Sequence, residues 1–252
     1  MSEQLQSDFD KLVKTSKFSN EEIQFKKNFL NNFIKKGFPN RKQEDWKFLD
    51  ISQIIKKNIS NLSYFNDYSQ SNKIDTSIFV DGLEHNKIIF INGRIEKIDF
   101  NFEDQNKIEI IDETKKDISF DYENSLIDLN SAFTDKVFKI IIKKNYSLKK
   151  PLIIYHSTND KIKSTNINLR LDFELGENSC LKLIDYFADI TTKNFINIFY
   201  NFNLEKDSIL KNYKIDKFIN NDLKYSFNNI EQGNNSVSET FILSAGSDYF
   251  KN

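Results

Sequence analysis

The stretch that decides the fold is Asn168-Leu-Arg-Leu-Asp-Phe-Glu-Leu-Gly-Glu-Asn-Ser-Cys-Leu-Lys182, because it returns as Asn197-Ile-Phe-Tyr-Asn-Phe-Asn-Leu-Glu-Lys-Asp-Ser-Ile-Leu-Lys211. The shift between the two segments is about 29 residues, which is typical of stacked repeat architectures. A similar turn returns at Asn235-Ser236. Each unit is strand, turn and strand, and such a unit buries its apolar face only by stacking on its neighbours. A parallel β-helix satisfies this requirement, and so does a sandwich of similar hairpins.

The strands of the repeat alternate between apolar and polar residues. The apolar positions of the first unit are Ile167, Leu169, Leu171, Phe173 and Leu175, and the polar positions between them are Asn168, Arg170, Asp172 and Glu174. Strict alternation predicts a strand with one face buried and the other facing solvent. Beyond Val137, further apolar runs separated by short polar turns predict more strands.

The region before the repeat is mixed. Ile89-Phe-Ile91 followed by Asn92-Gly93 predicts a strand that ends in a hairpin turn. Residues 101–124 are acidic, and we expect only short strands and loops there. Residues 60–77 are polar and rich in Asn, Ser and Asp, which marks a loop or a boundary.

The N-terminal part is predicted to be helical. Ser19 and Glu22 form a capping box before an apolar stripe at helical spacing, and Gly37 and Pro39 end that helix. A second helix is expected from Asp50, with Gln53 three residues later, to about Asn58, and another from Ser7 to about Thr15.

These patterns predict a mainly β protein, a right-handed parallel β-helix preceded by a small α-helical N-terminal domain. We expect the helical domain at 1–77 and the β-helix core at 78–252, with the chain ending within the solenoid.

The charge balance excludes several function classes. Lys and Arg total 36 against 37 Asp and Glu, for a net charge of -1. An interspersed, near-neutral balance gives no electrostatic footprint for nucleic acid or an anionic membrane surface. There is neither an N-terminal signal nor an apolar run long enough to span a membrane, so we expect a cytoplasmic protein.

Few residues in the chain carry obvious chemistry. Cys180 is the only cysteine, and with only His85 and His156 besides, a Cys/His metal site within one chain is not expected. His156 is a metal ligand or a base on one interpretation, and on the favoured one a strand-end histidine bonded to a backbone carbonyl. Cys180 is expected to be a small core residue. No nucleotide-binding or hydrolase motif is present, so we expect no enzymatic activity.

One segment stands apart, because it places the only tryptophan among charged residues directly after a helix stop. Trp46 lies close to Arg41, Glu44 and Lys47. Tryptophan and arginine dominate binding hot spots, so the segment is a candidate interface. Alternatively, Trp46 is the plug that docks the next element onto the helices.

This segment resembles a signature of the SufB/SufD family of iron–sulphur cluster assembly scaffold proteins, in its SufD form. The matching residues are Pro39, Arg41, Glu44, Trp46 and Lys47, while Phe48 replaces the usual Tyr and Leu49 the usual Thr. Four further segments are similar to family motifs in the same order: Ile89–Gly93, Leu129–Phe133, Pro151–His156 and Ser238–Gly246. In the last motif, Lys251 stands where Arg usually precedes Asn.

The resemblance implies a right-handed parallel β-helix and a non-catalytic role in a SUF-type complex. Its partners would be a SufB-like paralogue and a SufC-like ATPase, with a cysteine desulphurase as indirect sulphur donor. No cofactor is expected on this chain alone; the iron–sulphur cluster belongs to the complex. The family's SufC-binding helices and functional histidine would lie beyond Asn252.

Two alternatives remain. One is a SufB-type paralogue that bears cluster chemistry itself, against which the single cysteine argues. The other is a β-helix carbohydrate-active enzyme or adhesin, against which the mixed charges at Asn168, Arg170, Asp172 and Glu174 argue.

Overall fold

The structure is a computed structural model, which describes residues 2–59, 61–66, 73–113, 124–159, 161–187, 193–217, 223–245 and 250–251. Parts of three expectations lie outside these ranges. They are residues 67–72 of the expected boundary loop, residues 114–123 of the ambiguous acidic region, and Gly246 at the end of the last family motif.

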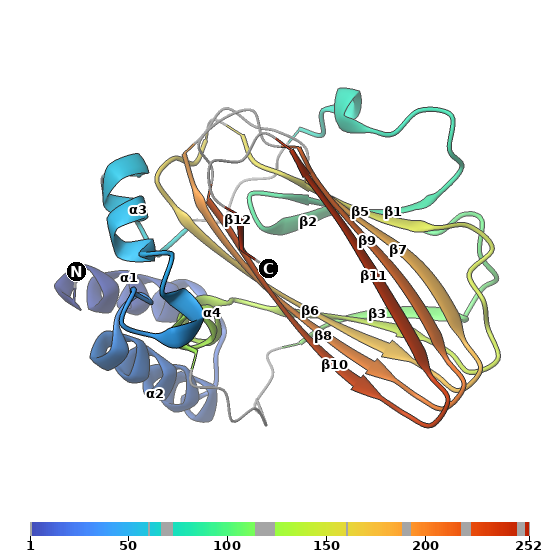
Figure 1. Cartoon of the computed structure of the whole chain (residues 1–252), viewed down its shortest axis with the longest axis horizontal. Coiled ribbons are helices and arrows are strands. Elements are labelled where there is room, and N and C mark those ends of the chain that lie inside the picture. Colours follow the sequence, from blue (N-terminus) through green and yellow to red (C-terminus); the bar gives the residue numbers. More distant parts are fainter. Residues whose placement is uncertain are drawn as a thin grey trace.

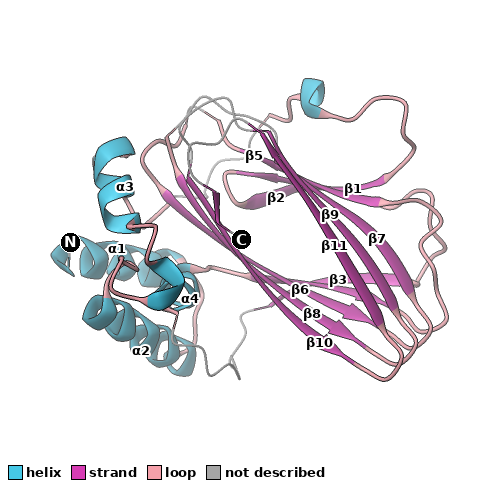
Figure 2. Ribbon diagram, viewed as in Figure 1, coloured by secondary structure: helices cyan, strands magenta, loops and turns pink. Residues whose placement is uncertain are grey.

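The chain is mainly β, with a parallel β-solenoid of about 3 turns preceded by helices (Figure 1). The strands are β1 Asn86–Ile91, β2 Arg94–Asp99, β3 Ile108–Glu113, β4 Val137–Ile142, β5 Leu152–Ser157, β6 Asn166–Leu175, β7 Cys180–Phe187, β8 Phe195–Leu204, β9 Ile209–Lys217, β10 Leu223–Gln232, β11 Val237–Ala245 and β12 Phe250–Lys251. They form two facing sheets, in the orders β11-β9-β7-β5-β1-β2 and β12-β10-β8-β6-β4-β3 (Figure 2). The predicted fold class is therefore confirmed.

The strand register reproduces the sequence repeat residue by residue. β6 and β8 are parallel neighbours that place Asn168 beside Asn197 and Leu175 beside Leu204. β7 and β9 likewise place Lys182 beside Lys211. Successive copies of the repeat thus lie one above the other in each sheet. This parallel pairing rules out the sandwich of hairpins, whose sequential strands would pair antiparallel.

One corner of each coil uses a left-handed residue. Asn145, Asn178, Asp207 and Asn235 have φ between 55° and 58°. Asn and Asp tolerate this conformation better than other residues with side chains. The corners also stack, because the Asn178 amide donates to the Lys206 carbonyl at 3.1 Å and the Asp207 amide to the Asn234 carbonyl at 2.9 Å. The recurring Asn/Asp-Ser turn therefore has a conformational cause.

Two strands complete the first coil with antiparallel pairing. β1 turns back into β2 through Asn92 and Gly93, with φ of 54° and 83°, as the hairpin prediction required. On the other sheet, β3 pairs antiparallel with β4. The space between the sheets is filled by an apolar core that includes Ile88, Ile154, Leu171, Phe173, Leu183 and Phe202.

The helices gather at one side of the second sheet (Figures 1 and 2). They are α1 Ser2–Thr15, α2 Asn20–Lys36, α3 Ile51–Asn58 and α4 Ser125–Phe133, together with the short 3-10 turn η1 Glu44–Trp46. A second 3-10 turn, η2 Thr76–Ile78, lies apart from them, next to β1 and β5 of the first sheet. The capping box of Ser19 and Glu22, the C-terminal Gly37 with φ of 70°, and the Asp50 cap on the Gln53 amide are all present. The three predicted helices are therefore present, although the first begins at Ser2 and not at Ser7 as expected.

α4 was not predicted, and it falls within the range expected for the β-helix core. All nine of its residues are buried, although Ser125, Asp128 and Ser131 recur at helical spacing, so its sequence does not show that it lies inside the molecule. It packs with α1 and α2 in one apolar cluster that also includes Phe195, Leu223 and Tyr225 of the solenoid. The helical part is thus joined to the β-helix through a shared core.

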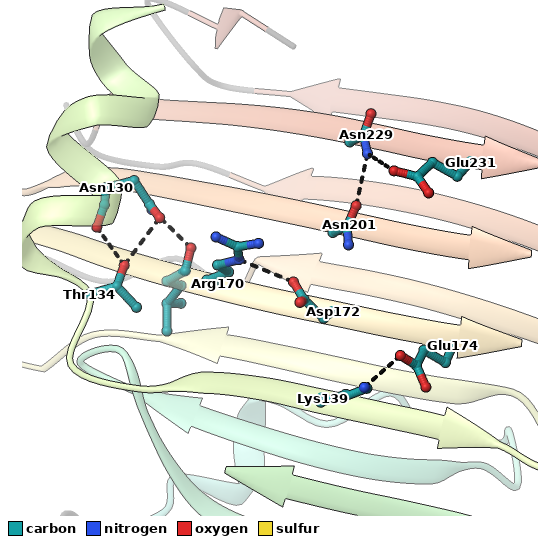
Figure 3. A network of polar contacts seen from close by, with 10 residues as sticks. Asn130, Thr134, Lys139, Arg170, Asp172, Glu174, Asn201, Asn229 and Glu231 are labelled. Carbon is teal, nitrogen blue, oxygen red and sulfur yellow. Dashed lines mark hydrogen bonds and ion pairs between the residues drawn. The ribbon is translucent and has the colours of Figure 1, made fainter. Parts of the chain in front are cut away.

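α4 also overturns the prediction that one face of β6 meets solvent. Asn168, Arg170 and Asp172 are buried on the outer side of the sheet, where α4 lies over its near end (Figure 3). The Asn130 amide of α4 donates to the carbonyls of Leu169 and Asn197 at 3.0 and 2.9 Å. Alternation correctly gave the two faces of the strand, but it does not tell whether another element covers the polar one. Asn168, Arg170 and Asp172 are therefore not surface residues, and their mixed charges do not argue against a carbohydrate-binding surface.

Candidate functional site

Trp46, from the segment predicted as an interface, is buried against the solenoid. It is 7% exposed, and its ring lies 5.7 Å from that of Tyr225 on β10. The Tyr225 hydroxyl in turn accepts a hydrogen bond of 2.6 Å from the Asn124 side chain before α4. Of the two interpretations offered by the sequence, the structure supports the plug, because Trp46 docks the loop between α2 and α3 onto the sheet.

The neighbours of Trp46 remain at the surface. Arg41 is exposed, and Lys47 pairs with Glu44 at 3.1 Å across one turn, both being well exposed. Phe48, which takes the place of the usual family Tyr, is 86% exposed. Surface pairs of this kind contribute little to stability, at most about 1 kcal/mol. The charged residues of the signature are therefore available to a partner, although Trp46 is not.

A larger apolar surface runs across the outer face of the first sheet. The strand register aligns Ile153, Ile184, Tyr213 and Phe241 in one row, and Tyr155, Tyr186, Ile215 and Leu243 in a second row. At the β5 end these rows are covered, because Phe79 and Val80 of the segment after η2 pack on Tyr155. We call the uncovered part the outer strip: Ile184, Tyr186, Tyr213, Ile215, Phe241 and Leu243.

The outer strip becomes more exposed toward β11. Phe241 and Leu243 are 57% and 53% exposed, and β11 has a hydrogen-bonded neighbour on one side only within the described sheet. Exposed apolar patches mark interaction sites. The outer strip is therefore the candidate functional site, an assembly surface.

Beneath this surface, between the two sheets, lies a buried polar cluster that the sequence did not reveal. His156 of β5 lies between the rings of Phe90 and Phe187, at 5.4 and 4.2 Å, and both contacts are stacked. The prediction of a carbonyl-bonded strand-end histidine is wrong. His156 Nε2 instead bonds to Asp185 Oδ1 of β7 at 2.7 Å. The imidazole is held by a carboxylate and two aromatic faces.

Asp185 connects this histidine to the opposite sheet. Its second oxygen accepts a hydrogen bond of 2.6 Å from the hydroxyl of Tyr200 on β8. Burial opposes its charge, but nearby His156, Lys224 and Lys214 outweigh burial and hold its pKa well below the usual range. Asp185 is therefore ionised. Because an ionised carboxylate only accepts hydrogen bonds, Nε2 of His156 carries the donated proton.

Two lysines complete the cluster and join the last coils. Lys214 of β9 donates to Ser226 and Asn228 of β10 at 2.8 and 2.7 Å, and Lys224 of β10 donates to Asp216 of β9 at 2.6 Å. Both lysines are buried. Burial lowers the pKa of Lys214 to about 7. These reciprocal bonds tie the two sheets together just below β11, so the cluster supports the assembly surface from inside.

The cluster is built from residues of five strands, β5, β7, β8, β9 and β10, so no local sequence motif predicts it. The only signal in the sequence was the charge of alternate positions such as Asp185, Lys214 and Asp216, which the repeat register turns inward. Cys180, expected in the core, instead lies half-exposed at the start of β7. Among the described residues, no three His, Cys, Asp or Glu side chains lie close enough to hold a metal ion.

A scan against models of known protein families found no match, and a search for similar sequences among curated proteins found none either. None of the helices in the described part of the chain is both long and apolar enough to cross a membrane. The family and the function implied by the sequence motifs therefore stand as a proposal.

Proposed function

We propose that this chain is a non-catalytic scaffold subunit of a SUF-type iron–sulphur cluster assembly complex. Its solenoid pairs with that of a SufB-like paralogue, and a SufC-like ATPase joins the same assembly. The cluster is the cargo of the complex, built with sulphur from a cysteine desulphurase, and is not a resident cofactor of this chain.

The observation that carries the proposal is the apolar outer strip, which is most exposed at Phe241 and Leu243 of β11. The side chains of a second solenoid can cover these two residues, because exposed apolar patches serve as interaction sites. The partner is identified by the ordered SufD-like motifs, from Pro39 to the last one near β11. A scaffold needs an interaction surface and a rigid frame, and the buried polar cluster that joins β9 and β10 stiffens the frame.

Co-purification tests this proposal. The tagged chain is co-expressed with the SufB-like and SufC-like proteins of the same genome, and the complex is isolated under native conditions. We expect the SufB-like protein to be retained, and the double variant Phe241→Ser/Leu243→Ser to lose at least about 90% of it, because hot-spot apolar contacts carry most interface energy.

The matched control is Phe48→Ser, which removes an aromatic residue that is even more exposed than Phe241 and lies outside the outer strip. It should retain the partner as the unmodified chain does. Failure of the unmodified chain to retain a SufB-like protein would count against the scaffold role. Equal retention by the double variant would move the contact away from β11.

A further inference from the structure

The first coil of the solenoid contains a cavity of about 420 Å³ on the side opposite β11. It lies between β2, the outermost strand of one sheet, and β3, the outermost strand of the other. The turn between α4 and β4 and part of β6 complete its wall. A cavity of this size accommodates a small organic molecule.

The inner wall of this cavity belongs to the apolar core of the solenoid. Phe138 and Leu169 are buried members of that core, and Ile95 and Ile110 pack against it from β2 and β3. Ile98 of β2 also lines the cavity, yet 45% of its surface is exposed. The antiparallel strands thus leave an opening through which a hydrocarbon group can reach apolar side chains. Covering them would release surface water.

The charged side chains that line the cavity differ in whether they already form ion pairs or hydrogen bonds with the protein. Lys136 forms an ion pair with Asp112, and Asp135 accepts a hydrogen bond of 2.7 Å from Ser16. Arg94 is the first residue of β2 and is exposed. Its side chain makes no ion pair or hydrogen bond with any described residue. A guanidinium group matches the geometry of a carboxylate and binds it through two parallel hydrogen bonds. Arg94 is therefore the group at this cavity that is ready to bind an anion.

We infer that this cavity binds an amphipathic monocarboxylate, a molecule with an apolar tail and one carboxylate. The tail lies against Phe138 and Leu169, and the carboxylate pairs with Arg94. The ion pair of Lys136 and Asp112 lies on the wall and stays intact when the ligand binds. Because Arg94 supplies the positive charge that the ligand meets, the site selects ligands by the charge of the head group. This role is independent of the assembly surface, because the cavity and β11 lie at opposite ends of the stack.

Isothermal titration calorimetry of the purified chain with sodium octanoate, 1-octanol and octylammonium chloride tests the inference. The three probes share an apolar tail and differ in the charge of the head group. We expect one octanoate per chain, with octanol at least about tenfold weaker and octylammonium weaker still.

Variants locate the site. Arg94→Met keeps the length of the side chain and should bring octanoate down to the affinity of octanol. Lys97→Met removes a cation from the same strand but not from the cavity, and it should leave octanoate binding unchanged. Ile98→Asp should weaken the binding of both octanoate and octanol at least tenfold. Far-ultraviolet circular dichroism melts of each variant confirm that the fold is retained.

The inference is overturned if octanoate does not bind, or if octanoate and octanol bind equally well. It is also overturned if Arg94→Met and Lys97→Met weaken octanoate to the same extent. Loss of binding in Phe241→Ser/Leu243→Ser, with Arg94→Met unaffected, would place the site on the outer strip instead and would equally refute it.

Discussion

His156 donates a hydrogen bond of 2.7 Å from Nε2 to Asp185 deep between the two sheets, where both side chains are buried. The bond joins neighbouring coils, since His156 belongs to β5 and Asp185 to β7. The Phe90 and Phe187 rings hold the imidazole in its plane, and the other carboxylate oxygen is bonded to Tyr200. A charge in this position is tolerated only because several partners share it.

Removing the charge of Asp185 should therefore destabilise the fold strongly. We expect Asp185→Asn to lower the free energy of unfolding by about 3–5 kcal/mol, because buried His156 loses its carboxylate partner and Lys214 loses a nearby negative charge. Equilibrium unfolding in urea measures this loss. The control is Glu239→Gln, whose partner Lys211 lies 3.4 Å away at the surface, and which should cost less than about 1 kcal/mol. An equal loss of unfolding free energy in the two variants would contradict a large stabilising contribution from the buried cluster.

Stability should rise with pH across the neutral and mildly alkaline range. Burial lowers the pKa of Lys214 to about 7 and that of Lys26 to about 8, from 10.5 in the unfolded chain. Between these values the unfolded state binds more protons than the folded state, so raising the pH favours folding, by up to about 1.4 kcal/mol per pH unit for each lysine. Urea unfolding from pH 7 to pH 10 measures the slope, and Lys214→Met should reduce it. An unchanged slope in that variant would contradict the assignment to Lys214.

The same stability should fall again above about pH 10. Burial raises the pKa of Tyr225 to about 12, and burial together with Asp185 raises that of Tyr200 well above its usual value. Above the ordinary tyrosine pKa of about 10, the unfolded state loses these protons while the folded state keeps them, so folding becomes less favourable. Thermal melts from pH 9 to pH 11.5 should show the decline. A continued rise through pH 11.5 would contradict the burial of these hydroxyls.

The solenoid could be predicted because its determinants repeat. The match of Asn168 to Asn197 and of Leu175 to Leu204 became a strand register without change, and the Asn/Asp-Ser turns became left-handed corners. The helix caps could also be predicted from the sequence, because Ser19 and Glu22 form hydrogen bonds within one helical turn. Features that repeat along the chain, or that depend on only a few neighbouring residues, do not depend on the rest of the fold.

The rest could not be predicted because it depends on which elements meet. α4 has polar residues at Ser125, Asp128 and Ser131, yet all nine of its residues are buried. No local pattern places it against β6, where Arg170 and Asp172 are also buried. His156 and Asp185 lie 29 residues apart by sequence number, and only the parallel register makes them neighbours. The outer strip likewise exists only across three strands, β7, β9 and β11. For Trp46, the sequence was compatible both with a binding anchor at the surface and with a plug inside the protein. The contact between its ring and that of Tyr225 favours the plug.

The plug assignment predicts that Trp46 contributes to stability. Trp46→Ala should lower the free energy of unfolding by about 3–5 kcal/mol, because it leaves a cavity against Tyr225. Arg41→Ala, an exposed neighbour, should change it by less than about 0.5 kcal/mol. As the only tryptophan, Trp46 also reports its own surroundings, so its emission should shift to longer wavelength on unfolding. A stable Trp46→Ala variant would favour the binding anchor.

Close stacking of the coils predicts the effect of a methyl group at Gly176. A Cβ atom there would lie 2.6 Å from the Lys144 amide nitrogen in the coil beside it. Gly176→Ala should therefore destabilise the chain by about 1–3 kcal/mol, although the lower entropy of an unfolded alanine acts the other way. Asn178→Gly, two residues later at a left-handed corner, should be nearly neutral. Urea unfolding measures both, and a stabilising Gly176→Ala would contradict the tight approach.

The proposed partner solenoid covers the outer strip at Phe241 and Leu243, and hydrogen–deuterium exchange of the backbone amides of β11 tests this most directly. Exchange is measured for residues 237–245 in the isolated chain and after addition of the SufB-like protein. Covering the outer strip restricts the local opening through which these amides exchange, so we predict that exchange there slows at least about tenfold, while that of residues 44–48 is unchanged. A complex that forms with no slowing in residues 237–245 would contradict the account.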